Sequence, residues 1–326
     1  MYNLNIKDLT RVFRIGGMMF GSKITAVDNV NIKVEQDTPW IMSIVGESGS
    51  GKTTLARMIL GLQEPSSGDV LLNGRSISEM RKVKKDFLTK VQPIFQNPFT
   101  AFSSRRPVIN YLYETALRLD IASNRDEAEQ AITTALKSVG IEIDHVRGKY
   151  PNQFSGGELQ RICIARALIT RPQFIVADEP VSMIDASLRM NIVNLFKDLK
   201  ANYNVCFIYI THDLSTANYV SDYVATMYRG NLIEFGNVRD IMSNPAHPYT
   251  ELLMESIPRV GKRWDDDMVL PDFESKEYAA SGCKFASRCR YVKDICHRLQ
   301  PHMLNISDSH SVLCYRHNEY KEMDVK

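Results

Sequence analysis

Residues 46 to 53 read Gly46-Glu47-Ser48-Gly49-Ser50-Gly51-Lys52-Thr53, which matches the phosphate-binding pattern G-x-x-x-x-G-K-[ST]. An apolar run at residues 41–45 precedes the loop, and apolar residues at helical spacing follow it at residues 55–62. This order predicts a buried strand, a glycine loop and a helix. The glycines let successive backbone N–H groups converge on phosphate oxygens at a helix N-terminus, whose dipole favours anions.

Within this loop we expect Lys52 to reach the β- and γ-phosphates of a nucleotide and the Thr53 hydroxyl to ligate Mg²⁺. Thr54 follows directly and completes the predicted nucleotide-binding set. A chance match to the pattern would occur in roughly 1% of random chains of this length. The flanking strand and helix make a chance glycine-rich turn the weaker interpretation.

A second apolar run, at residues 174–177, ends in the carboxylates Asp178 and Glu179. An aspartate at such a strand end holds Mg²⁺ in phosphate-loop proteins. Glu179 is then the candidate general base for the attacking water. Alone, two acidic residues at a strand end also fit a solvated turn. Together with the loop at residues 46–53, they predict a second half of the same site.

The wider pattern predicts an α/β fold. Apolar strand segments alternate with helical segments before residue 97 and again after residue 170, as in a mostly parallel sheet covered by helices. Residues 97–170 instead look mainly helical, like an insertion into the sheet domain. Because the pattern fades near residue 245, we expect an ATPase domain over residues 1–245 and a cysteine-rich extension over residues 246–326.

Bulk properties exclude some classes of function. Lys plus Arg is 40 and Asp plus Glu is 38, so the net charge of +2 gives no electrostatic footprint for nucleic acid. No run approaches 18 consecutive apolar residues, and the first eight residues do not resemble a signal peptide. We therefore expect a cytosolic chain that acts at a membrane only by docking onto another protein.

Four of the six cysteines, namely Cys283, Cys289, Cys296 and Cys314, lie in the predicted extension. Four thiolates could build a tetrahedral site for zinc or an iron–sulfur cluster. Zinc ligands usually come in close pairs, which this spacing lacks, although four of the seven histidines lie nearby and leave a mixed zinc site open. Simple burial of the thiols is the other possibility, whereas disulfides are disfavoured in the cytosol.

The other two cysteines, Cys163 and Cys206, sit inside apolar stretches and are expected to be small buried hydrophobes.

Five further segments carry a resemblance to a known family. Residues 154–158 (Phe-Ser-Gly-Gly-Glu) resemble the signature of ABC ATPases, usually Leu-Ser-Gly-Gly-Gln. The other elements of the family also occur in the expected order along the chain: Gln96 in a Phe-Gln-Asn-Pro segment, Asp185 after Ser-Met-Ile, and His212 in Thr-His-Asp. Phe13 lies where the family places an aromatic ring against adenine. The resemblance covers residues 1 to about 245. It implies the phosphate-loop ABC cassette fold, with antiparallel N-terminal strands and an inserted helical subdomain.

The resemblance also implies a mechanism. Two such subunits close head to tail, and each ATP lies between the loop of one subunit and the signature of the other. Ser155, Gly156 and Gly157 would therefore act on the partner's ATP. Three further residues receive roles: Gln96 would sense Mg²⁺ and couple the site to a permease, His212 would contact the γ-phosphate, and Asp185 would communicate across the dimer interface.

The sequence departs from the family pattern at two places. Glu158 replaces the usual glutamine, and Met183-Ile184 replaces the common Ala-Leu. Ser155 and Glu158 also form a capping-box pattern, which is a purely structural reason for the glutamate. Neither change removes a catalytic group. We therefore expect the chain to hydrolyse ATP, at a rate that these two changes leave open.

The C-terminal part narrows the resemblance. Residues 244–250 (Asn-Pro-Ala-His-Pro-Tyr-Thr), with Gly-Cys-Lys-Phe at 282–285 and Arg-Cys at 288–289, look like the extension of oligopeptide/dipeptide importer ATPases. In that group the cysteines are associated with a [4Fe–4S] cluster; zinc and a metal-free tail remain alternatives.

The resemblance further implies a place in an assembly. The chain would dock on two permease subunits at the cytoplasmic face of the membrane, beside a related ATPase chain and beneath an extracytoplasmic binding protein. The solute would be a peptide, an oligosaccharide or a metal. Two rivals are a soluble ABC ATPase that acts on nucleic acid or ribosomes, and a metal- or redox-sensing module. The single cassette disfavours the first, and the intact Glu179 and His212 disfavour the second.

Overall fold

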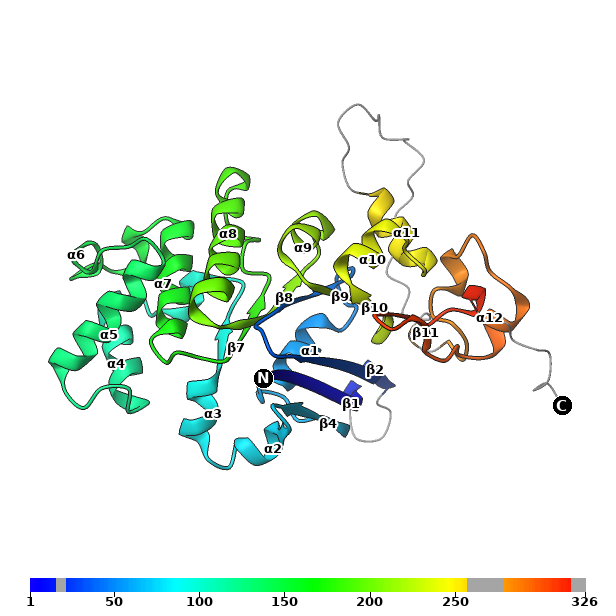
Figure 1. Ribbon diagram of the computed structural model, residues 1–326, viewed down its shortest axis with the longest axis horizontal. Coiled ribbons are helices and arrows are strands. Elements are labelled where there is room, and N and C mark those ends of the chain that lie inside the picture. The colour runs from blue at the N-terminus through cyan, green and yellow to red at the C-terminus, as the bar shows by residue number, and fades with distance from the viewer. Residues whose placement is uncertain (16–21, 257–277, 279, 318–326) are drawn as a thin grey trace.

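The computed structural model describes residues 1–15, 22–256, 278 and 280–317 (Figure 1). Its centre is an eight-stranded mixed sheet in the order β11-β12-β10-β9-β3-β8-β7-β6, and a four-stranded antiparallel sheet has the order β2-β1-β4-β5. The strands are β1 (Tyr2–Ile15), β2 (Ser22–Gln36), β3 (Ile41–Val45), β4 (Ser67–Leu72), β5 (Arg75–Ser76), β6 (Val91–Ile94), β7 (Phe174–Asp178), β8 (Cys206–Thr211), β9 (Tyr223–Tyr228), β10 (Asn231–Asn237), β11 (Leu304–Ser307) and β12 (His310–Val312).

The middle of the central sheet is parallel, as the sequence predicts. Strand β3 pairs in parallel with β8 and β9, and β7 pairs in parallel with β6 and β8. All five residues of β3 are buried. Met42 and Ile44 face one hydrophobic core, which the sheet shares with α1 and the antiparallel strands, whereas Ile41 faces a second core under the helical subdomain. Both faces of the sheet are thus covered, which explains the continuous apolar run.

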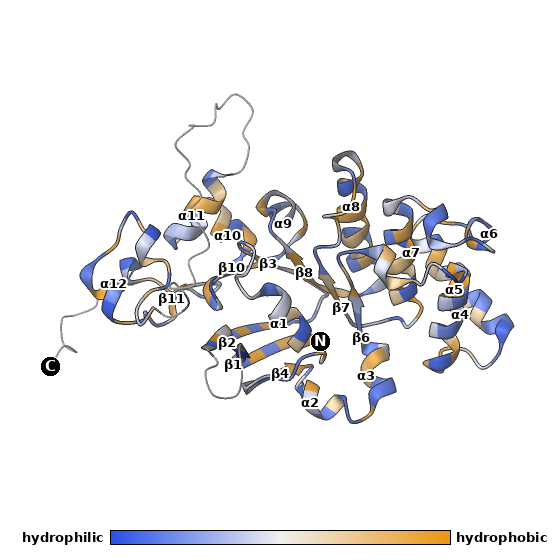
Figure 2. Cartoon of the chain, turned by 180° about the vertical axis from the view of Figure 1, so that it is seen from behind, coloured by the Kyte–Doolittle hydropathy of each residue, from blue (hydrophilic) through white to orange (hydrophobic). Residues whose placement is uncertain are grey.

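The antiparallel sheet also follows its sequence pattern. Val30, Ile32 and Val34 of β2 are buried while the residues between them are exposed, so one face of the strand packs on the core. Figure 2 shows the same alternation as bands of hydrophobic and hydrophilic residues along β1 and β2.

The helices confirm the predicted insertion between β6 and β7. Helices α4 to α7 gather at one end of the molecule (Figure 1), and Asn124 caps α5 by accepting a hydrogen bond from the amide of Glu127 at 2.9 Å. The helices are α1 (Lys52–Ile59), α2 (Ile77–Met80), α3 (Lys84–Lys90), α4 (Val108–Arg118), α5 (Arg125–Ser138), α6 (Ile143–Val146), α7 (Gly156–Leu168), α8 (Ala186–Tyr203), α9 (Leu214–Val220), α10 (Val238–Ser243), α11 (Pro248–Glu255) and α12 (Asp294–Arg298), with 3₁₀ turns η1 (Pro98–Ala101), η2 (Pro151–Gln153), η4 (Ala286–Arg288) and η5 (Tyr315–His317).

The C-terminal extension joins the central sheet at the end opposite the helical subdomain (Figure 1). Strand β12 pairs antiparallel with β10, with Val312 opposite Glu234, and β11 continues the sheet. The boundary predicted near residue 245 therefore separates two segments that share one sheet. Residues 257–277 and 318–326 of the predicted extension lie outside the described residues. None of the helices in the described part of the chain combines the length and apolar character that a membrane crossing requires.

Candidate functional site

The glycine loop connects β3 to α1 in the predicted order. Gly51 is the residue that precedes α1, and its φ of 104° is a left-handed conformation. A β-carbon at this position would also clash with the carbonyl oxygen of Ala26. Gly46 has a φ of 148°, and a β-carbon there would clash with the carbonyl oxygen of Met227. Both glycines are therefore required by the turn that brings the loop amides to the start of α1.

The side chain of Lys52 lies inside the curve of this loop. Its Nζ donates to the carbonyl oxygen of Gly46 at 2.7 Å and to that of Glu47 at 2.8 Å, and the residue is buried. Burial lowers the pKa of Lys52, while the nearby carboxylates of Glu179, Asp178 and Glu47 act in the opposite direction. The loop therefore holds one buried cation at the place where the pattern predicts contact with phosphate.

Thr53 and Asp178 meet beside the loop. The Thr53 hydroxyl donates to Oδ1 of Asp178 at 3.4 Å, which brings two of the three predicted magnesium ligands together. Burial raises the pKa of Asp178 and the neighbouring Glu179 adds to this, while the hydrogen bond from Thr53 opposes it. A hydroxyl beside a carboxylate is the oxygen donor set that Mg²⁺ prefers.

The three predicted catalytic residues lie together. Nε2 of Gln96 donates to Oε2 of Glu179 at 3.0 Å, and Nδ1 of His212 lies 3.3 Å from Oε1 of the same carboxylate. The three residues follow β6, β7 and β8, which are adjacent parallel strands, and ligand sites of α/β sheets form at this carboxyl edge. Glu179 has a φ of 45°, a strained conformation for a non-glycine residue.

The signature segment lies at the start of α7. Ser155 and Glu158 make the predicted capping box: the carboxylate of Glu158 accepts from the Ser155 amide at 2.9 Å and from its hydroxyl at 2.8 Å. Gly156 lies against the carbonyl oxygen of Met183, and Gly157 lies near Ile184. The signature thus adjoins Met183 and Ile184, the two residues that precede Asp185. Asp185 itself is exposed. Among the hydrogen bonds of the described residues, none joins the signature to Glu179.

Phe13 lies on β1, paired with Ile24 of β2. The guanidinium of Arg11 lies 4.7 Å from the centre of its ring, so one face of the ring is covered by a cation. The residue is partly exposed. Its contact with adenine stays a prediction.

The four clustered cysteines line one cavity of the extension. Cys283, Cys289, Cys296 and Cys314 all border a space of about 20 Å³, and all are free thiols. Burial raises the pKa of Cys283 to about 12. Within the described ranges, no group of three or more His, Cys, Asp or Glu side chains is placed to hold a single metal ion.

The remaining two cysteines are buried as predicted. Burial raises the pKa of Cys163 and of Cys206 to about 12.

The extension also contacts the glycine loop, which the sequence did not reveal. Arg288 forms two hydrogen bonds to the carboxylate of Glu47, at 3.1 and 3.0 Å. The Tyr249 hydroxyl accepts from the amide of the same Glu47 at 2.8 Å, and the Tyr278 hydroxyl donates to the carbonyl oxygen of Gly49.

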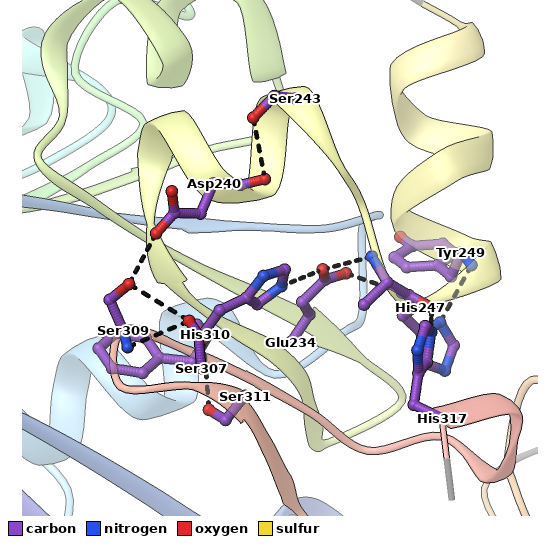
Figure 3. A network of polar contacts seen from close by, with 12 residues as sticks. Glu234, Asp240, Ser243, His247, Tyr249, Ser307, Ser309, His310, Ser311 and His317 are labelled. Carbon is purple, nitrogen blue, oxygen red and sulfur yellow. Dashed lines mark hydrogen bonds and ion pairs between the residues drawn. The ribbon is translucent and has the colours of Figure 1, made fainter.

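A buried network fixes the segment that contains Tyr249 (Figure 3). Glu234 is fully buried and accepts from the amides of Ala246 and His247 at 2.7 and 3.1 Å, and its carboxylate lies 2.7 Å from Nε2 of His310. Nδ1 of His247 accepts from the amide of Tyr249 at 3.0 Å and so caps α11. The residues at 246–249 thus orient Tyr249 toward the glycine loop.

A phosphate-binding loop, a strand that ends in Asp-Glu and a histidine after the next strand define a P-loop nucleoside triphosphatase. The family model described as ABC transporter matches residues 27–182, and the model described as oligopeptide/dipeptide transporter, C-terminal region, matches residues 233–296. The chain belongs to the ATP-binding proteins of ABC transporters, in the oligopeptide/dipeptide group.

Similar proteins extend over nearly the whole chain. It is 34% identical to the oligopeptide transport ATP-binding protein AppF of Bacillus subtilis over 96% of each chain. It is 31% identical to the di/tripeptide transport ATP-binding protein DppF of Pseudomonas aeruginosa, over 97% of this chain and 98% of that one. A solved structure of the ATP-binding cassette MJ0796, a dimer in a post-hydrolysis state with ADP and Pi, is 26% identical with a TM-score of 0.62, over 72% of this chain and 99% of that chain.

Proposed function

We propose that this chain hydrolyses ATP to drive the import of oligopeptides, dipeptides or related solutes such as oligosaccharides or metals. The observation that carries the proposal is the cluster of Gln96, Glu179 and His212 beside the glycine loop, with distances of 3.0 and 3.3 Å. Similar proteins named for oligopeptide and di/tripeptide transport support a peptide as the solute.

The geometry suggests a role for each residue. The loop amides of residues 46–54 and the ammonium of Lys52 would bind the phosphates, and Thr53, Asp178 and Gln96 would hold Mg²⁺, which supplies a Lewis acid to the reaction. Glu179 would accept the proton of the attacking water, because its carboxylate is oriented by hydrogen bonds on both oxygens. His212 would reach the γ-phosphate from the neighbouring strand. Phe13 would stack on adenine.

The active unit is proposed to be a head-to-tail dimer. Ser155, Gly156, Gly157 and Asp185 make no hydrogen bond to Glu179 among the described residues. Gly156 and Gly157 instead lie near Met183 and Ile184, which directly precede Asp185, and Met183 is 56% exposed. A partner's loop at these residues would complete both sites. A related but different ATPase chain is the proposed partner.

The experiment is to measure ATPase rate per chain against protein concentration. We expect the specific rate to rise steeply, since each site requires two chains, and to rise further on addition of the permease pair. A constant specific rate from a chain shown to be monomeric would contradict the dimer.

An importer ATPase of this kind would have further partners. Two transmembrane permease subunits would hold the chain at the cytoplasmic face of the membrane, and an extracytoplasmic binding protein would deliver the solute. Residues 1–245 would form the motor, and residues 246–326 the extension. Co-expression with permease subunits tests this, because a permease-free, nucleic-acid-bound chain would instead support the rival class of soluble ABC ATPase.

We also propose that Cys283, Cys289, Cys296 and Cys314 bind a [4Fe–4S] cluster, with zinc as the alternative. What supports this is that all four thiols, spread over one segment, border the same cavity. A cluster would supply metal–thiolate bonds that cross-link the segment. The space between the thiols is only about 20 Å³, so binding a cluster would require the thiols to rearrange.

A further inference from the structure

The loop residue Glu47 is held from two directions by the extension. Its backbone amide donates to the hydroxyl of Tyr249 at 2.8 Å. Its carboxylate accepts two hydrogen bonds from the guanidinium of Arg288, in the paired geometry that makes arginine–carboxylate contacts specific. The Arg288 side chain is only 12% exposed, so water competes little with this pair.

The segment that carries Arg288 is itself fixed to the ATPase domain. Lys284 is buried, and its Nζ donates to Oδ2 of Asp28 at 3.0 Å and to the carbonyl oxygen of Arg229 at 2.9 Å. Phe285 packs edge-on against Tyr228 and Tyr249. These contacts leave the segment little freedom to move away from the loop.

The same segment forms a wall of the four-cysteine cavity. Cys283 and Cys289 flank Lys284, Phe285 and Arg288 in the sequence, and Phe285 borders the cavity together with the four thiols. One short stretch of chain therefore faces the thiols on one side and the phosphate-binding loop on the other.

The charges show why this contact matters for nucleotide. Glu47 places a carboxylate on the loop that binds the phosphates, and its charge acts on the Lys52 ammonium. Without a counter-charge it would repel a triphosphate. Arg288 neutralises that carboxylate and holds it against the extension, where Tyr228 also contacts the guanidinium at 3.4 Å.

We propose that Arg288 is a positioning residue for the phosphate-binding loop, and that through it the cysteine-rich extension and the nucleotide site are energetically coupled. The proposal rests on the nucleotide site described above but not on the identity of any metal. Coupling between two sites is reciprocal, so bound nucleotide must also stabilise the segment between Cys283 and Cys289.

The first test measures equilibrium binding of a fluorescent, non-hydrolysable ATP analogue with Mg²⁺ to the full-length chain. Arg288→Gln should weaken binding about tenfold, because an uncompensated carboxylate remains on the loop. Arg288→Lys keeps the charge but loses the paired geometry, so its loss should be smaller. The double variant Glu47→Gln/Arg288→Gln should recover most of the affinity, which a merely misfolded extension would not allow.

Arg290→Gln is the matched control. Arg290 lies in the same extension and pairs with Glu251 at 2.6 Å and with Glu255 at 3.1 Å, but it does not contact the loop. Its removal should leave nucleotide affinity within about twofold of wild type. Equal losses for Arg288→Gln and Arg290→Gln would overturn the proposal, as would a double variant that binds no better than Arg288→Gln.

The second test follows amide hydrogen exchange with and without the same analogue. Peptides that cover residues 283–289 should exchange at least about three times more slowly when nucleotide is bound. Arg288→Gln should abolish the difference. Unchanged exchange in the wild type would refute the coupling. Lys52→Ala distinguishes failure of the proposed nucleotide site from failure of the coupling. If Lys52→Ala binds nucleotide normally, the proposed site is wrong. If Lys52→Ala loses binding while Arg288→Gln binds normally, only the coupling is rejected.

Discussion

The carboxylate of Glu179 is held by the side chain of Gln96, with 3.0 Å between Nε2 and Oε2. The two residues follow adjacent parallel strands, β6 and β7, so the sheet itself fixes their separation. His212 approaches the other oxygen of the carboxylate from β8. A base that is oriented on both oxygens needs little rearrangement to accept a proton from a positioned water.

Glu179→Gln should separate binding from chemistry. The amide keeps the shape of the side chain but removes the proton acceptor, so turnover should fall by roughly 10²–10⁴ while ATP binding survives. Single-turnover measurements and size-exclusion chromatography with ATP should show trapped nucleotide in a dimer. Near-normal hydrolysis would move the base elsewhere, with His212 as the next candidate.

Lys52→Ala should abolish nucleotide binding and turnover. The ammonium is the buried cation inside the loop, bonded at 2.7 and 2.8 Å to loop carbonyls, and the loop amides cannot replace its charge. Titration calorimetry with Mg-ATP measures the loss. The exposed Lys23 offers a control, since Lys23→Ala changes charge equally without touching the loop. Wild-type affinity in Lys52→Ala would disprove the site.

The parallel core of the fold was predictable from the sequence because its signals are local. The run at residues 41–45 is a strand over those residues, and the glycine loop leads into α1. The capping box at Ser155 and the N-cap at Asn124 also depend only on residues three apart.

The contact between Arg288 and Glu47 was not predictable in this way. The two residues lie 241 positions apart, and neither periodicity nor spacing reports a pairing at that separation. The same holds for the hairpin β11–β12. Its strands are only four and three residues long. Strand β12 is held by pairing with β10, and β11 pairs with β12, rather than either following a pattern of its own.

Glu158→Gln should strengthen the ATP-bound dimer. Glu158 accepts two hydrogen bonds from Ser155, so its negative charge lies beside the hydroxyl that is proposed to meet the partner's γ-phosphate. Glutamine keeps one acceptor for the cap and removes the charge, and dimer affinity with ATP should rise about three- to tenfold. Sedimentation velocity of the Glu179→Gln background with and without Glu158→Gln measures this. A weaker dimer would show that the carboxylate is needed for the cap alone.

Glu234→Gln should destabilise the junction of the extension and the sheet. The fully buried carboxylate has three partners, namely the amides of Ala246 and His247 and the ring of His310. An amide group would place a donor against one of these donors, at a cost of about 2–4 kcal/mol. Chemical denaturation measures the loss, and Glu35→Gln, at an exposed site on β2, is the control. An unchanged unfolding midpoint would show that the network contributes little to stability.

Anaerobic purification tests the four-cysteine site directly. A [4Fe–4S] cluster would give brown protein, with broad absorbance near ~400 nm and about four irons and four sulfides per chain. Cys→Ser at position 283, 289, 296 or 314 should remove the colour, because each thiol borders the same cavity. Cys163→Ser and Cys206→Ser are the matched controls, since both thiols are buried in the ATPase domain. If the extension is coupled to the loop through Arg288, chelation of the iron should also change nucleotide affinity. Colourless protein with one zinc per chain would support the alternative ligand, and folded, metal-free protein would reject both.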